Sequence, residues 1–177
     1  MMGWAQKTSF RSFLAAVASG LAVALCVHFL TASGVVAALA RDLAAARNIA
    51  ARLGIDHRVI DLAGAYKNVV LDYFREEYLA GRTPNPCVRC NQRMKFGFLL
   101  EQARAQGVAF DKFATGHYAR TRYDAASGRW QLRRGKDAGK DQSYFLSRLR
   151  QEQLAGLIFP LGDLSKGEVK ALARELG

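Results

Sequence analysis

Cysteine is scarce in this chain of 177 residues, which contains three: Cys26, Cys87 and Cys90. A secreted protein held together by disulfides needs a denser, even-numbered set. Three cysteines in a chain of this size therefore exclude a disulfide framework. The x2 spacing of Cys87 and Cys90 indicates a reducing compartment and a redox, metal-binding or catalytic role for the pair.

Acidic residues are also few, with 15 Asp and Glu against 26 Lys and Arg and a net charge of +11. The excess is concentrated in residues 82–150, where 15 Lys and Arg stand against 5 Asp and Glu. Such a segment suits a polyanionic partner, because each neutralised phosphate releases counterions. The alternative interpretation is a basic surface that serves solubility alone.

Residues 12–40 contain no Asp, Glu, Lys or Arg at all, and residues 13–29 are almost wholly apolar. Taken alone, about 20 apolar residues are typical of a signal peptide or a membrane-spanning helix. The many Ala, Gly and Ser residues argue against a span. Ordinary globular sequence follows residue 40, so we divide the chain into an apolar leader, 1–40, and a domain, 41–177.

Hydrophobic periodicity in residues 41–177 predicts alternating helices and strands. Helices are expected over 41–53, over 66–78 with an apolar stripe packed in the core, and from residue 92 to Gly107; Gly54 and Gly81 end the first two. Strands are expected over 55–62 and 110–115, and within 118–132 as a hairpin. Ser165 and Glu168 have the spacing of a capping box that begins a last helix. This alternation favours an α/β fold, a parallel sheet with covering helices.

The Cys87 and Cys90 pair lies in residues 82–91, where two prolines and the lack of a hydrophobic period predict a surface loop. A structural zinc site would need a second pair of ligands, and the remaining candidates do not repeat the spacing: Cys26, His28, His57 and His117. At a helix N-terminus, the helix dipole and nearby cations would lower a thiol pKa; these cations are Arg89, Arg93 and Lys95. An activated thiol is therefore favoured over a zinc site or two buried small residues.

Four segments resemble tRNA-specific 2-thiouridylases, in that family's order. Residues 81–91, Gly-Arg-Thr-Pro-Asn-Pro-Cys-Val-Arg-Cys-Asn, resemble its signature loop and are followed by Lys95 and Phe96. The other blocks are Ala-Thr-Gly-His-Tyr at 114–118, Lys-Asp-Gln-Ser-Tyr-Phe-Leu at 140–146 and Phe-Pro-Leu-Gly-Asp-Leu at 159–164. The resemblance implies an incomplete α/β fold like the adenine-nucleotide α-hydrolases, of the Rossmann-like ATP pyrophosphatase type.

The resemblance also implies roles for single residues. Cys90, directly before an asparagine, matches the nucleophile, and Gly116 matches a position that contacts ATP. The segment that lines the flipped target base corresponds to Asn85, Pro86 and Cys87. Further tRNA contacts correspond to His117, Lys140, Asp141 and Gln142. Cys87 stands where relatives often have Asp, so the chemistry does not require its thiol.

The implied activity replaces the C2 oxygen of the wobble uridine in tRNA with sulfur. ATP, with Mg²⁺, adenylates that oxygen, and a persulfide on a second cysteine supplies the sulfur while the first cysteine helps to release it. A disulfide bond belongs to the same set of family features. The expected partners are tRNA and a sulfur-donor protein, with no DNA and no protein-bound metal. An enzyme that uses ATP and tRNA has no need of export, so we expect the cytoplasm and no membrane.

Two parts of the family pattern are missing from the sequence. It has no Ser-Gly-Gly-x-Asp-Ser loop to cradle ATP phosphates, and no match to the second, sulfur-carrying cysteine. Residues 1–40 are then either a genuine leader or the product of an upstream shift of reading frame, which the abrupt return of similarity favours. The alternative functions are a non-catalytic tRNA-binding remnant and a membrane-anchored redox protein that uses Cys87 and Cys90.

The isolated chain is expected to bind ATP weakly and to leave tRNA unmodified, because it lacks the phosphate loop and the second cysteine. The measurement is nucleoside mass spectrometry of tRNA after incubation with purified chain, ATP and a sulfur donor. Formation of 2-thiouridine would contradict this expectation.

Overall fold

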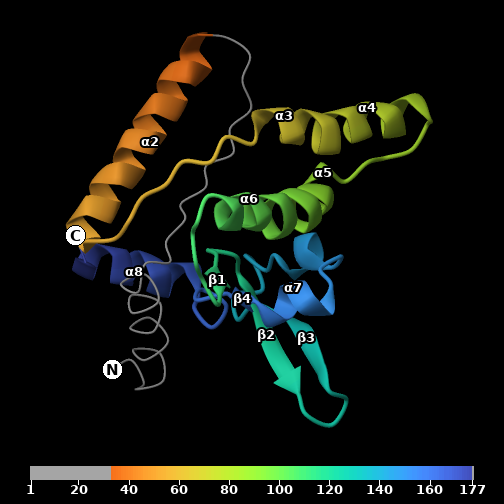
Figure 1. The fold of residues 1–177 in the computed structure, drawn as a ribbon. Coiled ribbons are helices and arrows are strands. Elements are labelled where there is room, and N and C mark those ends of the chain that lie inside the picture. Colours follow the sequence, from red (N-terminus) through yellow and green to blue (C-terminus); the bar gives the residue numbers. More distant parts are fainter. Residues whose placement is uncertain (1–32, 177) are drawn as a thin grey trace. The chain divides into compact units, whose positions relative to one another are not determined.

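The structure, a computed structural model, describes residues 33–176, so most of the predicted apolar leader lies outside the described residues (Figure 1). The chain divides into two compact units, Met1–Leu62 and Ala63–Gly177, and each is described by itself. Between residues 33 and 176, no helix is both long and apolar enough to cross a membrane.

The described part of the first unit is one long helix followed by an extended segment. Helix α2 spans Ser33–Leu53 and ends at Gly54, whose φ of 64° is left-handed, so the helix predicted over 41–53 is confirmed and begins earlier. The strand predicted over 55–62 is wrong. Residues 55–62 form no regular structure, because a strand needs a hydrogen-bonded neighbour and no described segment supplies one.

The second unit begins with a helical run made of α3 (Ala63–Tyr66), the π-helical η1 (Lys67–Leu71) and α4 (Asp72–Leu79). Its predicted core packing holds only in part. Val70 is 1% exposed, but Phe74 is 38% and Tyr78 58% exposed. The reason is the π-helical turn, which has more residues per turn than an α-helix and rotates the residues after it away from the buried side.

A second helical run carries both cysteines of the signature segment and consists of α5 (Pro86–Arg89), the π-helical η2 (Cys90–Phe98) and α6 (Leu99–Ala105). The loop predicted over 82–91 is therefore wrong from Pro86 onward. Asn85 is the N-cap and its side chain accepts a hydrogen bond from the Val88 N–H at 3.1 Å. Pro86 occupies the first helical position, where a missing N–H costs nothing.

The strands form two separate pairs (Figure 1). Strands β1 (Phe113–Ala114) and β4 (Leu157–Ile158) are parallel, with Phe113 opposite Leu157. Strands β2 (Ala119–Asp124) and β3 (Arg129–Arg134) form the predicted antiparallel hairpin. The predicted α/β fold with parallel strands and covering helices is thereby confirmed. The buried apolar side chains of this unit include Val88, Met94, Phe96, Leu99, Phe113, Leu146, Leu154, Leu157 and Leu164.

The last elements are η3 (Ser143–Leu146), α7 (Gln151–Ala155) and α8 (Lys166–Leu176). The predicted capping box of α8 is confirmed. The Ser165 N–H donates to the Glu168 carboxylate at 2.6 Å, and the Glu168 N–H donates to the Ser165 hydroxyl at 3.2 Å. The hydrogen bond from the Ser165 backbone, with help from Lys136 at 2.9 Å, lowers the pKa of Glu168 to about 2.

Gly162, in the last motif block, lies where two stretches of backbone touch. A Cβ at this position would lie 2.0 Å from the Ala119 carbonyl oxygen, at the start of β2. The Gly162 carbonyl also accepts a hydrogen bond from the Lys136 N–H at 2.8 Å. The turn before α8 is thus fixed against both ends of the hairpin, and only a glycine fits between them.

Substitution of Gly162→Ala is expected to lower the free energy of unfolding by about 2 to 3 kcal/mol, because backbone must move to admit the methyl group. The measurement is the urea midpoint of unfolding. Gly64→Ala is the matched control, since a Cβ in helix α3 meets nothing within 4 Å. Alanine is the better helix former, so this control should be neutral or slightly stabilising. Equal midpoints for the two variants would refute the tight contact.

Candidate functional site

A pocket of about 290 Å³ in the second unit contains most of the predicted chemistry. Its lining residues come from the helical run 86–98, from α3 and from the segments after β1 and β3. They are Tyr66, Pro86, Cys87, Cys90, Asn91, Lys95, His117, Gln142 and Phe145. Five of the nine residues predicted for the site therefore meet around one cavity: Pro86, Cys87, Cys90, His117 and Gln142.

The other four predicted residues do not line this pocket. Asn85 caps its helix, and its side-chain amide donates to the Tyr144 hydroxyl at 3.4 Å. Asp141 accepts hydrogen bonds from the Gly135 N–H at 2.9 Å and the Ser143 hydroxyl at 2.8 Å, so it holds the loop that carries Gln142. Lys140 and Gly116 are exposed.

Four lining residues were missed as site residues. Asn91 and Lys95 belong to the signature block, so their position in the motif was a usable signal. The sequence predicts Tyr66 in the core. It reaches the pocket only because α3 packs beside the helical run 86–105, here called the cysteine helix. Burial, and the nearby Cys90 and Cys87 thiols, raise the pKa of Tyr66 to about 12, so its phenol is protonated at neutral pH. Phe145, the fourth, gave no signal beyond its place in the third motif block.

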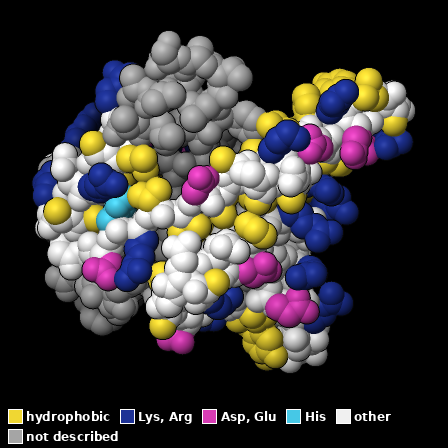
Figure 2. Space-filling view, turned by 45° about the horizontal axis from the view of Figure 1, so that its top comes forward, with side chains coloured by type: hydrophobic (Ala, Val, Ile, Leu, Met, Phe, Trp, Pro, Cys, Tyr) yellow, Lys and Arg dark blue, Asp and Glu magenta, His cyan; other side chains and the backbone are white. Residues whose placement is uncertain are grey.

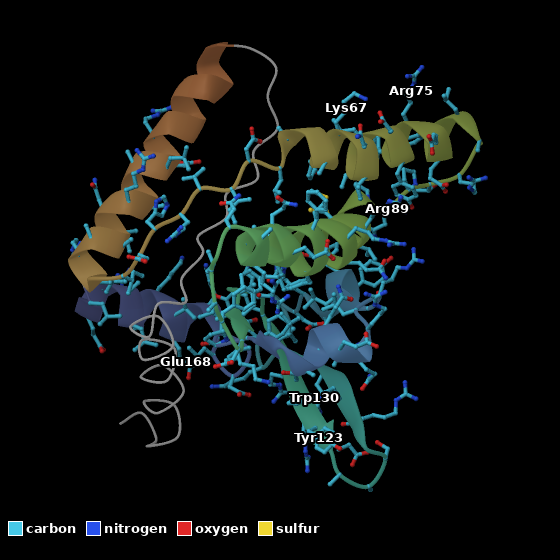
Figure 3. The ribbon with its side chains drawn as sticks, in the orientation of Figure 1. Lys67, Arg75, Arg89, Tyr123, Trp130 and Glu168 are labelled. Atoms are coloured by element: carbon cyan, nitrogen blue, oxygen red, sulfur yellow. The ribbon has the colours of Figure 1, made fainter. Side chains whose placement is uncertain are left out.

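The start of the cysteine helix is anchored by Arg89, which is labelled in Figure 3. Its Nε donates to the Val69 carbonyl at 2.7 Å, and its guanidinium lies 4.4 Å from the centre of the Tyr73 ring. A hydrogen bond from a charged donor stabilises by about 1.5–3 kcal/mol, and this one is partly buried. Arg89 therefore fixes the helix against the run 63–79 and does not line the pocket.

Cys90 does not have the lowered pKa expected from the sequence. Burial raises the pKa of its thiol above the ordinary value, and Lys95 offsets this only in part. The expectation was wrong because desolvation of the half-buried thiolate costs more than a nearby cation returns. Cys87, by contrast, is exposed, and both cysteines are free thiols.

His117 is a neutral imidazole in the pocket wall. Its ring lies 5.8 Å from Phe96 and 6.0 Å from Phe159, measured between ring centres, and Nδ1 is 2.8 Å from the Thr115 hydroxyl. Burial, with a smaller contribution from Lys95, lowers its pKa to about 4. A base this weak cannot hold a proton taken from the Cys90 thiol, so a hydrogen-bonding role suits it better.

Asn91 lines the pocket and has an unused acceptor. Its side chain is 5% exposed, and its Nδ2 donates to the Phe145 carbonyl at 3.3 Å. Its Oδ1 is buried and has no hydrogen-bond partner among the described residues. Leaving a buried acceptor unpaired costs about 1–3 kcal/mol, so this oxygen is suited to receive an N–H from a bound molecule.

Two hydrogen bonds connect Gln142 to the chain beside His117. The Tyr118 N–H donates to the Gln142 side-chain oxygen at 3.0 Å, and the Gln142 N–H donates to the Tyr118 carbonyl at 2.9 Å. The second and third motif blocks are thereby joined at the pocket, although 24 residues separate Tyr118 from Gln142.

The described residues hold no ready-made metal site, and the glycine predicted to contact ATP makes only ordinary contacts. No group of three or more His, Cys, Asp or Glu in residues 33–176 is arranged to hold a metal ion. At Gly116 a Cβ would make an ordinary contact of 3.6 Å with Leu161, so the fold itself does not demand glycine there. The Ser-Gly-Gly-x-Asp-Ser string expected for the family does not occur in the sequence.

Acidification from pH 7 to pH 5 is expected to destabilise the second unit through His117. The unfolded chain takes up the proton below about pH 6.5, whereas the folded one resists it down to about pH 4. Stability is therefore lost as the pH falls through this window, by about 2 kcal/mol at pH 5. Urea unfolding of His117→Gln should lack this part of the loss. The carboxylates titrate in both proteins, and an unchanged pH dependence in the variant would show that His117 is not the cause.

Comparison with known proteins agrees with the four motif blocks. Residues 20–177 match the family model described as the tRNA methyl transferase HUP domain. The tRNA-specific 2-thiouridylase MnmA of Treponema denticola is 49% identical over 147 residues, which are 82% of this chain and 40% of that protein. The enzyme of the same name from Geotalea uraniireducens is 54% identical over 136 residues, 77% of this chain and 36% of that protein.

A third relative, the tRNA-specific 2-thiouridylase MnmA of Heliobacterium modesticaldum, is 49% identical over 132 residues, 75% of this chain and 34% of that protein. The chain thus spans two fifths or less of the length of these relatives. Because the family model covers most of the chain, this protein belongs to the tRNA methyl transferase HUP domain family and resembles its tRNA-specific 2-thiouridylases.

Proposed function

We propose that this chain carries the target-base pocket and the nucleophilic thiol of a tRNA 2-thiouridylase. Such an enzyme replaces the C2 oxygen of the wobble uridine with sulfur. The observation that carries the proposal is the meeting of Cys90, His117 and Gln142, from three motif blocks, around one cavity. The names of the similar proteins, which specify thiolation of tRNA, support it.

The pocket suits a flipped pyrimidine base. Uracil offers one N–H between two carbonyl groups, and the pocket offers an unpaired acceptor on Asn91 and a cationic donor on Lys95. Tyr66 and Phe145 add aromatic surface, which a base that has left its stack can contact. Pro86 and Cys87 complete the wall on the side of the helix start.

Cys90 supplies the reactive sulfur in this proposal. Its thiolate attacks the inner sulfur of a persulfide on a donor cysteine, forms a disulfide with that cysteine, and releases the outer sulfur as hydrosulfide. The hydrosulfide attacks C2 of the adenylated uridine, and the C2 oxygen leaves as part of AMP. A thiol attacks only as thiolate, and burial disfavours that form here. Lys95 lowers the pKa of Cys90, so we assign Lys95 to stabilise the thiolate.

The remaining assignments follow the family. By the family pattern, His117, Lys140, Asp141 and Gln142 would contact tRNA, and Gly116 would lie by the nucleotide. ATP with Mg²⁺ activates the uridine, a sulfur-donor protein loads the persulfide, and the reaction belongs in the cytoplasm. For Asp141 the structure favours a supporting role, since its carboxylate is occupied by Gly135 and Ser143.

Binding of tRNA without catalysis is the second candidate function, and the excess of 15 Lys and Arg over 5 Asp and Glu in residues 82–150 favours it. A redox function for the Cys87 and Cys90 pair has less support. Thiols of that class have a lowered pKa, whereas burial raises the pKa of Cys90.

The proposed base pocket is tested by protection of Cys90 from alkylation. At a tRNA concentration ten times the Kd, tRNA with uridine at the wobble position should slow iodoacetamide labelling of Cys90 about tenfold. Trypsin cleaves after Arg89 and so separates the peptides of Cys87 and Cys90 for mass spectrometry.

The control is the same tRNA with cytidine at the wobble position, which presents a ring of similar size without the uridine N–H. It should protect Cys90 less, because Asn91 would then face a ring nitrogen that has no hydrogen. Protection that is equal for the two transcripts, or absent for both, would count against a uridine-binding pocket.

A further inference from the structure

The β2–β3 hairpin carries a row of arginines that the pocket does not use. Directly opposite residues of an antiparallel pair lie on the same face, and the register pairs Arg120 with Arg133, Arg122 with Gln131 and Asp124 with Arg129. We call this set the arginine face; it consists of Arg120, Arg122, Asp124, Arg129, Gln131 and Arg133. Residues 119–134 contain five Arg and one Asp.

The opposite face of the hairpin carries an aromatic pair, and α7 is hydrogen-bonded to the backbone of β3. There Tyr123 and Trp130 lie 5.5 Å apart between ring centres, and both are labelled in Figure 3. The Gln151 side chain of α7 accepts from the Trp130 N–H at 2.8 Å and donates to its carbonyl at 3.0 Å. On the arginine face, Arg122, Arg129, Gln131 and Arg133 are all exposed.

The described residues neutralise the arginine face only in part, through Asp124 within it and through Asp163. Arg120 forms an ion pair with Asp163 at 3.3 Å, but Arg129 and Arg133 form none with any residue in the part of the chain that the structure describes. Arg120 and Arg133 lie directly opposite each other, and like charges in this position are destabilising. Solubility alone does not call for a like-charged pair, whereas a polyanion would relieve the repulsion.

The base of the hairpin is joined to the wall of the pocket. Tyr118, directly before β2, exchanges two hydrogen bonds with Gln142, and Gly135, directly after β3, donates to Asp141. Strands of six residues reach about 20 Å from this junction. The arginine face is thus an extension of the segment that contributes Gln142 to the Cys90 pocket.

We propose that the arginine face binds backbone phosphates of the tRNA whose base enters the Cys90 pocket; this rests on the proposed function. Guanidinium groups bind phosphate oxygens through two parallel hydrogen bonds, and their spacing along strands suits a row of separate phosphates. Figure 2 shows Lys and Arg side chains scattered over the visible face, so the test must separate the arginine face from general basicity.

The test compares two variants that each remove three positive charges. The hairpin variant is Arg122→Gln with Arg129→Gln and Arg133→Gln. The matched control is Arg75→Gln with Lys170→Gln and Arg174→Gln, all exposed residues of α4 and α8. Affinity for tRNA is measured from low to high salt. The logarithm of the association constant decreases linearly with the logarithm of the salt concentration. In the hairpin variant the magnitude of this slope should be smaller by about 2 to 3. The control should keep the slope of the unsubstituted chain.

A third variant, with Lys at the three hairpin positions, should retain most of the slope, because the effect depends on charge. The proposal is overturned if the hairpin variant and the control have equal slopes. It is also overturned if the hairpin variant keeps its tRNA slope but loses binding to phosphatidylserine vesicles, which would make the face a membrane surface. If tRNA fails to protect Cys90 of the unsubstituted chain but the hairpin variant still shows the smaller salt dependence, the base pocket alone is refuted. If the unsubstituted chain binds no tRNA, both the base pocket and the arginine face are refuted.

Discussion

The site depends first on where the cysteine helix begins. Asn85 accepts the Val88 N–H and Pro86 takes the first helical position, so the helix starts before Cys87. Cys87, Cys90 and Asn91 then stand at positions i, i+3 and i+4, which lie on one side of a helix. All three line the same pocket for this reason. A start only a few residues later would leave Cys87 in a loop with no fixed relation to the nucleophile.

Desolvation sets the electrostatic character of the pocket. It raises the pKa of Cys90 and Tyr66 and lowers that of His117, so in each case the neutral form is favoured. Positive charge is instead abundant on the exposed hairpin, where water solvates it. The cationic surface and the mostly neutral pocket thus lie in different places. Such an arrangement suits a protein that attracts a nucleic acid at long range and binds an uncharged base at short range.

Local patterns in the sequence were sufficient for the features that depend on few neighbouring residues. The capping box at Ser165 and Glu168, the hairpin turn at Gly128 and the helix ends at Gly54, Gly81 and Gly107 were all predictable for this reason. The motif blocks correctly identified the family. Whether residues 55–62 form a strand depends on a neighbouring strand. The pKa of Cys90 depends on its burial, and the position of Tyr66 depends on tertiary packing. No local pattern contains these quantities. Predicting the arginine face requires the register of β2 and β3. That register follows from counting the residues outward from a turn at Gly128.

Because Cys90–Phe98 is π-helical, the number of residues in this helix determines which side chains face the pocket and which face the core. Its cysteine end faces the pocket while Met94, Phe96 and Leu99 are held in the core. Each residue of a helix advances the face by about 100°, and a π-turn accommodates a residue that an α-turn would not. Deletion of one residue here would relax the stretch to an α-helix. The helix could then keep either its apolar residues in the core or the Cys90 thiol in the pocket, but not both. A change in residue count along this helix would therefore disturb the pocket and the core together.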